Sequence, residues 1–103
     1  MWIDVASDKD FQVQLRVEVE GKAYALFRLD DGIYALDDVC SHEYSRLSEG
    51  ELWDDEVYCP KHGSRFDIKN GEVRSLPAFR PVNSYPTKVE NARVFIEITG
   101  GGR

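Results

Sequence analysis

Four side chains that bind soft and borderline metals lie in two short segments of this 103-residue chain. The first segment holds Cys40 and His42, and the second, after 16 intervening residues, holds Cys59 and His62. The chain has two cysteines and two histidines, so this pattern uses every thiol and every imidazole that it contains. Thiolates and imidazoles are the ligands of zinc, copper and iron–sulfur sites. The spacing therefore predicts one metal centre held by all four residues.

Two kinds of metal centre accept this set of ligands. A structural zinc ion takes Cys2His2 as a closed tetrahedron, and a [2Fe–2S] cluster can take two thiolates on one iron and two imidazoles on the other. Zinc loops usually place cysteine near cysteine and histidine near histidine. Here each segment holds one residue of each type, so each can give one ligand to each iron. A disulfide between Cys40 and Cys59 would leave both histidines unexplained.

The surrounding residues resemble the Rieske family, and most closely its stand-alone ferredoxins. The resemblance covers about residues 30–98. It is carried by four runs in addition to the ligands: Leu47-Ser48-Glu49-Gly50, His62-Gly63-Ser64-Arg65-Phe66-Asp67, Leu76-Pro77-Ala78 with Pro81, and Tyr85-Pro86-Thr87-Lys88-Val89. In the family, the first run follows the first ligand pair and the second run follows the second pair. The third run covers the cluster, and the fourth returns the chain to a base sheet.

The resemblance implies a one-electron carrier that holds one [2Fe–2S] cluster on Cys40, His42, Cys59 and His62. It also implies protein partners: a flavin-dependent reductase that supplies the electron and a terminal oxygenase that receives it. The two cysteines are expected to be buried, and the two histidines are expected to face the partners. An oxygenase needs a mononuclear iron with further histidines. The chain has no third histidine, so it is not expected to be an enzyme.

Two alternatives remain open from the sequence. One is a small electron-transfer subunit of another redox complex. The other is a zinc-binding structural module that has no redox role. Visible absorption separates the zinc module from both electron carriers, because iron–sulfur proteins are coloured.

The resemblance also implies which residues surround the cluster. Backbone N–H groups of Gly63 and Ser64 are expected to donate to the sulfides, and Pro77 is expected to stiffen the loop beside them. Glycines at positions 50 and 63 are expected where the backbone is strained or closely approached.

The reduction potential can be placed within the Rieske range by the same resemblance. High-potential members carry an additional cysteine in each ligand segment, joined as a disulfide, where this chain has Ser45 and Lys61. Those members also have a serine and a tyrosine that donate to cluster sulfurs. Ser64 matches the serine, but Phe66 replaces the tyrosine. We therefore expect a potential in the lower half of the range, at about −150 to 0 mV.

Length, composition and charge limit the other possibilities. A chain of 103 residues predicts a single domain, with composition ordinary for a soluble globular protein. Residues 1–7 show no basic region and no long apolar run, so they are not expected to be a signal peptide. No apolar stretch is long enough to span a bilayer, so no membrane association is expected. The net charge of −6 argues against nucleic acid as a partner. We expect a cytoplasmic protein, where thiols stay reduced, and a monomer.

Charge is distributed unevenly around the four ligands. Residues 30–56 hold ten carboxylates and one base, whereas residues 60–80 hold five bases and two carboxylates. The segments therefore carry net charges of −9 and +3. They are either ordinary solvated faces or a bipolar surface that steers partners toward the cluster.

Hydrophobic periodicity predicts an all-β fold of the Rieske type. Apolar residues alternate with polar ones over 11–19, and strands are also expected over 2–5, 23–29, 33–36, 52–58, 65–68, 85–89 and 94–98. Turns are predicted at 21–22, at 30–32 and at 70–71, and a short helical turn between 44 and 50. Residues 1–38 and 82–99 are expected to form an antiparallel sandwich or barrel, with a small cluster-binding subdomain at about 39–80 inserted between them.

Overall fold

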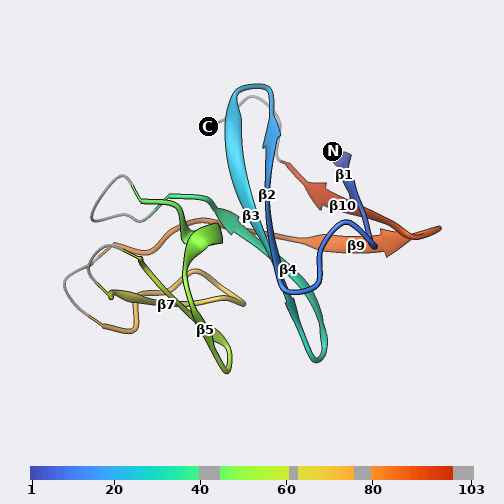
Figure 1. The fold of residues 1–103 in the computed structure, drawn as a ribbon. Helices are drawn as coiled ribbons and strands as arrows, with labels where there is room; N and C mark the ends of the chain where they lie inside the picture. Colours follow the sequence, from blue (N-terminus) through green and yellow to red (C-terminus); the bar gives the residue numbers. More distant parts are fainter. Residues whose placement is uncertain (40–44, 61–62, 76–79, 99–103) are drawn as a thin grey trace.

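The computed structural model describes residues 1–39, 45–60, 63–75 and 80–98, and Figure 1 shows how its strands are arranged. These are β1 (Trp2–Ser7), β2 (Gln14–Val19), β3 (Lys22–Leu29), β4 (Gly32–Asp37), β5 (Leu52–Trp53), β6 (Glu56–Tyr58), β7 (Arg65–Asp67), β8 (Ser84–Tyr85), β9 (Thr87–Glu90) and β10 (Arg93–Glu97). One 3₁₀ turn, η1 (Leu47–Glu49), is the only helical element in the described part of the chain. The prediction of an all-β fold is therefore confirmed.

The strands form three antiparallel sheets. Their strand orders are β1-β10-β9, β2-β3-β4-β8 and β5-β6-β7. In Figure 1, β5 and β7 lie on one side of the four-stranded sheet, and β9 and β10 lie on the other. The β5-β6-β7 sheet falls within the segment predicted to bind the cluster, and the limits of that segment stay a prediction.

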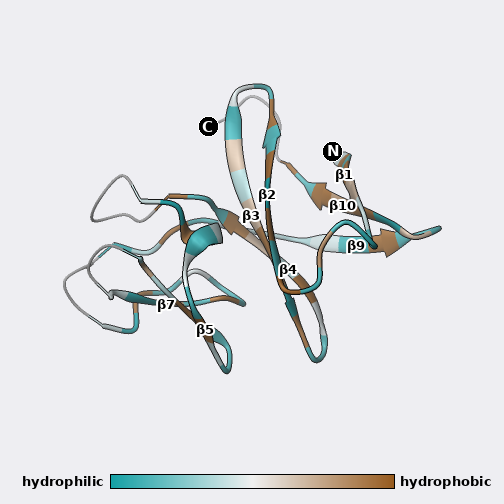
Figure 2. Ribbon diagram, in the orientation of Figure 1, coloured by the Kyte–Doolittle hydropathy of each residue, from teal (hydrophilic) through white to brown (hydrophobic). Residues whose placement is uncertain are grey.

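Both faces of the four-stranded sheet are covered, which explains the unbroken apolar run of β3. Tyr24 and Leu26 pack with Ala6, Val94 and other residues in the core between this sheet and the β1-β10-β9 sheet. Ala25 and Phe27 point to the opposite face, into a core shared with the β5-β6-β7 sheet. Figure 2 shows the apolar stretches along β3 and β4, with polar residues at the tip of their hairpin. The β5-β6-β7 sheet therefore packs directly on the four-stranded sheet.

Two predicted strands differ from the strands that the structure shows. The strand predicted over 11–19 begins at Gln14, and the following turn is Glu20-Gly21, with φ of 52° and 84°, rather than 21–22. Residues 52–58 form a hairpin, not one strand, because Leu52 pairs with Val57 and Asp54 takes a φ of 53°. Aspartate tolerates this left-handed conformation better than most residues.

The other predicted turns agree only in part with those of the structure. The predicted reversal at 30–32 is confirmed, since Leu29 pairs with Gly32, and the helical turn between 44 and 50 is η1. Near Asn70 the chain reverses, but only a single bridge from Phe66 to Val73 follows, so no two-residue hairpin forms. The strand predicted over 85–89 is divided at Pro86, which has no N–H to donate, so Tyr85 joins β4 instead.

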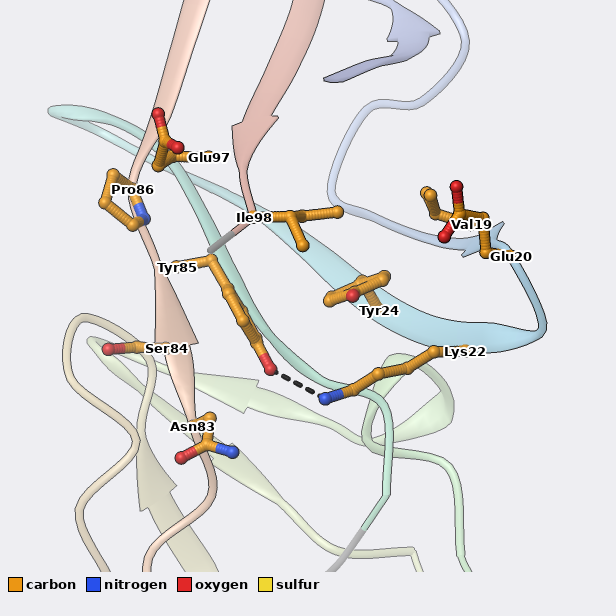
Figure 3. A pocket seen from close by; sticks show the side chains of 10 residues that line it. All are labelled: Val19, Glu20, Lys22, Tyr24, Asn83, Ser84, Tyr85, Pro86, Glu97 and Ile98. Atoms are coloured by element: carbon orange, nitrogen blue, oxygen red, sulfur yellow. Dashed lines mark hydrogen bonds between the residues drawn. The ribbon is translucent and has the colours of Figure 1, made fainter. Parts of the chain in front are cut away.

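Lys22, Tyr85 and Asp37 form a polar cluster at the edge of the four-stranded sheet. Lys22 Nζ donates to the Tyr85 hydroxyl at 2.9 Å, and that hydroxyl donates to Asp37 Oδ1 at 2.5 Å. Figure 3 shows the hydrogen bond between Lys22 and Tyr85 within a hollow. The hollow is lined by residues of the β2-β3 hairpin and by residues 83–86, 97 and 98. Burial and the bond to Asp37 raise the pKa of Tyr85 above its ordinary value of 10.0. The hydrogen bond that Lys22 donates to Tyr85 likewise raises the pKa of Lys22, against the opposing effect of burial.

The polar cluster of Lys22, Tyr85 and Asp37 predicts a loss of stability at alkaline pH. Because both folded-state pKa values lie above those of the unfolded chain, their contribution is complete below pH 10.0 and is lost as pH rises further. We expect the free energy of unfolding to fall more steeply above pH 10.0 in the wild type than in Tyr85→Phe. Denaturant titrations over a series of pH values measure both slopes. Parallel slopes would show that the cluster does not contribute.

Candidate metal centre

Cys59 is the one predicted ligand that lies among the described residues. It directly follows β6 and is 1% exposed. Cys40, His42 and His62 lie outside the described residues, as does Pro77. Within the described part of the chain, no three metal-binding side chains gather elsewhere. The structure therefore describes the site through Cys59 and through the segments that flank the other predicted ligands.

A tight backbone turn holds Cys59. Its N–H donates to the Ser64 carbonyl at 2.7 Å, and its own carbonyl accepts from the Gly63 N–H at 2.9 Å. Gly63 has a φ of +74°, which a residue with a side chain would adopt only with strain. The prediction of unusual backbone at position 63 is therefore confirmed. A cluster sulfide would have to share the Gly63 N–H with the Cys59 carbonyl.

The surroundings of Cys59 are dry. Leu47, Val57 and Phe66, each fully buried, belong to the same core cluster. Ser64 is also fully buried. A buried thiol among apolar side chains suits an iron–sulfur ligand, because the exclusion of water raises the cost of losing the metal–sulfur bond and limits oxidation. The donor set and the burial of Cys59 therefore fit a cluster at this position.

Asp38, two residues before Cys40, is a buried carboxylate. Its side chain is 0% exposed, although the sequence placed it among surface charges. Its Oδ1 accepts from the Ser48 N–H at 2.7 Å, and its Oδ2 accepts from the Ser48 hydroxyl at 2.7 Å and from Arg16 at 2.8 Å. These bonds join the two described ends of the first ligand segment.

A close backbone approach connects that segment to β6. A Cβ atom built on Gly50 would collide with the carbonyl oxygen of Tyr58, and the φ of Gly50 is an ordinary −82°. The Tyr58 N–H also donates to the Glu51 carbonyl at 2.8 Å. Because Tyr58 immediately precedes Cys59, the end of the first ligand segment lies against the strand that carries the second. The predicted role of Gly50 is confirmed.

Three of the five bases in residues 60–80 pair with carboxylates of the two charged segments. Arg65 pairs with Glu56 at 2.8 Å, and Lys69 reaches Asp31 at 2.9 Å and Asp55 at 3.7 Å. Arg74 pairs with Asp67 at 2.5 Å; burial alone would raise the pKa of Asp67, but Arg74 lowers it below its ordinary value. The net charges of the two segments therefore overstate the field available to steer a partner.

Comparison with known proteins decides the family. The family model of the Rieske [2Fe-2S] domain matches residues 1–86. The chain belongs to the Rieske family. The ferredoxin component of a naphthalene 1,2-dioxygenase system from Pseudomonas putida is 38% identical over 100 residues, which cover 95% of this chain and 96% of the relative. The cofactor of this Rieske chain is accordingly a [2Fe–2S] cluster, and the zinc alternative is not supported.

Solved structures agree with this assignment. A chain of the complex of reduced oxygenase and oxidised ferredoxin in carbazole 1,9a-dioxygenase has a TM-score of 0.84 and 33% identity, covering 92% of this chain and 91% of that one. A ferredoxin of Sphingomonas yanoikuyae B1 has a TM-score of 0.89 at 24% identity, covering 96% of this chain and 100% of that one, which supports the fold.

Proposed function

We propose that this Rieske protein is the ferredoxin component of a ring-hydroxylating dioxygenase system. It would accept one electron from a flavin-dependent reductase and pass it to a terminal oxygenase, acting as a cytoplasmic monomer. The observation that carries the proposal is the match of nearly the whole chain to a dioxygenase ferredoxin component. Matches to a terminal oxygenase of carbazole 1,9a-dioxygenase and to Dicamba monooxygenase cover 30% and 32% of those longer chains, at 22% and 28% identity.

We assign Cys40, His42, Cys59 and His62 as the cluster ligands. When bound, such a cluster takes up and releases one electron at a potential above that of all-cysteine clusters. The chain itself contributes a buried, apolar environment for Cys59 and backbone hydrogen bonds that join Cys59 to Gly63 and Ser64. We assign the partner-facing positions to the two histidines, whose second ring nitrogens would lie on the path of the electron.

Electron transfer to an oxygenase tests this function. The chain is reduced with dithionite, freed of excess reductant and mixed without air with the oxidised terminal oxygenase of a naphthalene or carbazole dioxygenase system. After mixing, we expect the visible spectrum of the chain to return to that of its oxidised form. Bovine serum albumin in place of the oxygenase should leave the spectrum of the reduced chain unchanged. A chain that stays reduced with both oxygenases would contradict the proposal. Reduction by the reductase of the naphthalene system, with NADH, tests the other half.

Phe66→Tyr is expected to raise the reduction potential by about 40 mV. Phe66 is fully buried beside Cys59 in the same core cluster, so a hydroxyl added to its ring enters a dry region. If it donates to a cluster sulfur, it stabilises the more negative reduced state by about 1 kcal/mol, which corresponds to about 40 mV for one electron. Protein-film voltammetry measures both proteins. An unchanged or lower potential in the variant would contradict the hydrogen-bond account, and a wild-type potential well above about +100 mV would contradict the placement in the lower half of the range.

A further inference from the structure

Four polar side chains from three separate parts of the chain meet beside the first ligand segment. Gln14 and Arg16 come from β2, Asp38 follows β4, and Ser48 lies in η1. We call this group the loop clamp. None of its members is a proposed ligand, and the proposed function does not use it.

Asp38 is the centre of the loop clamp. It is fully buried and accepts three hydrogen bonds, two from Ser48 and one from Arg16. A buried carboxylate is costly unless it is paired and hydrogen-bonded, so these partners are needed to keep it in place. Because Asp38 and Ser48 are ten residues apart, their bonds close the segment that contains Cys40 and His42.

The loop clamp also joins the first ligand segment to the second. The side-chain amide of Gln14 donates to the carbonyl oxygens of Ser48 and Gly50, the latter at 2.9 Å. Gly50 in turn lies against Tyr58, the residue before Cys59. A continuous series of contacts therefore runs from β2 through the loop clamp to the second ligand segment.

We infer that Asp38 is a positioning residue that, through Ser48, Arg16 and Gln14, holds the first pair of ligands at the geometry that the cluster requires. The inference rests on the proposed assignment of Cys40 and His42 as ligands. It supplies a non-covalent brace in a chain whose two cysteines are both assigned as ligands, so that none is left for a disulfide. Release of the cluster needs local opening of its ligand segments, and the rate of release reports how firmly they are held.

Three variants remove different parts of the loop clamp. Ser48→Ala removes one donor to Asp38 and leaves the backbone bond. Asp38→Asn keeps an acceptor for the Ser48 N–H but loses the charge, and Asp38→Ala removes every hydrogen bond that Asp38 accepts. With a chelator in excess, well below the unfolding temperature, we expect the visible absorption to bleach about tenfold faster in Ser48→Ala and about a hundredfold faster in Asp38→Ala. Asp38→Asn should lie between Asp38→Ala and the wild type.

Asp8→Asn is the matched control. Asp8 pairs with Arg28 at 2.9 Å, and this partly exposed pair belongs to the base and not to the ligand segments. We expect its rate of bleaching to stay within about twofold of the wild type, because a partly exposed pair contributes little.

Spectroscopy and potential separate positioning from general destabilisation. In reduced protein that retains its cluster, we expect shifted g values in Ser48→Ala and unchanged g values in Asp8→Asn. Removal of the Asp38 charge in Asp38→Asn should raise the potential, and removal of the opposite charge in Arg16→Met should lower it. A general loss of stability would not produce shifts of opposite sign.

The possible results lead to distinct conclusions. Wild-type bleaching rates in both Ser48→Ala and Asp38→Ala would overturn the inference, as would an equal acceleration in Asp8→Asn or identical potentials in Asp38→Asn, Arg16→Met and the wild type. A wild type that holds no iron and sulfide would overturn the ligand assignment together with the inference. Electron transfer to an oxygenase plays no part in these measurements, so the proposed partners are tested separately.

Discussion

Cys59→Ala is expected to abolish the [2Fe–2S] cluster. The wild type should contain about two iron atoms and two acid-labile sulfides per chain, and the variant should contain almost none, because one iron loses a ligand from a site that water otherwise cannot reach. Iron and sulfide assays together with the visible spectrum measure this loss. Amide hydrogen exchange should also become faster in the β5-β6-β7 sheet, whose core includes Cys59.

Val57→Ala is the control for the packing change at Cys59. Val57 is fully buried in the same core cluster, two residues earlier, but has no atom that binds iron. We expect it to lower the free energy of unfolding by about 2 kcal/mol while the metal content stays at the wild-type level. A Cys59→Ala protein with wild-type iron, or a wild type that contains stoichiometric zinc without sulfide, would contradict the assignment.

Gly50→Ala is expected to cause a large loss of stability. The added methyl group would collide with the carbonyl oxygen of Tyr58, and backbone atoms cannot move away as a flexible side chain can. We expect a loss of about 3 kcal/mol or more, which corresponds to about 15 °C in the thermal midpoint of a domain of this size. Thermal unfolding of the holoprotein, followed by circular dichroism, measures it.

Gly21→Ala provides the comparison. Gly21 has a φ of +84°, but nothing lies within 4 Å of the position that a Cβ atom would take. Its substitution therefore costs only the left-handed backbone conformation, about 1 kcal/mol or about 5 °C. Equal losses in the two variants would show that the segment after the first ligands moves away from β6 without cost.

Local patterns were sufficient to predict the cofactor and the class of fold. The members of each ligand pair are two or three residues apart, so their proximity is imposed by the chain itself and needs no tertiary contact. The strands around Leu26 and Ile96 were likewise predictable, because alternating or continuous apolar residues are a local property. The division of residues 52–58 into a hairpin was missed, since Asp54-Asp55 is a weaker turn signal than Asp31-Gly32.

The sequence by itself determined which family the chain belongs to and that the fold is all-β, and it predicted which side chains bind the metal. Only the tertiary structure decided that Asp38 is buried and bonded to Arg16, that Lys69 neutralises Asp31, and that Gly50 lies against Tyr58. The physical reason is that burial, ion pairing and steric contact depend on distances between residues far apart in the chain. Periodicity and residue type do not contain those distances, so a carboxylate such as Asp38 has the same local pattern whether it faces water or holds a ligand segment in place.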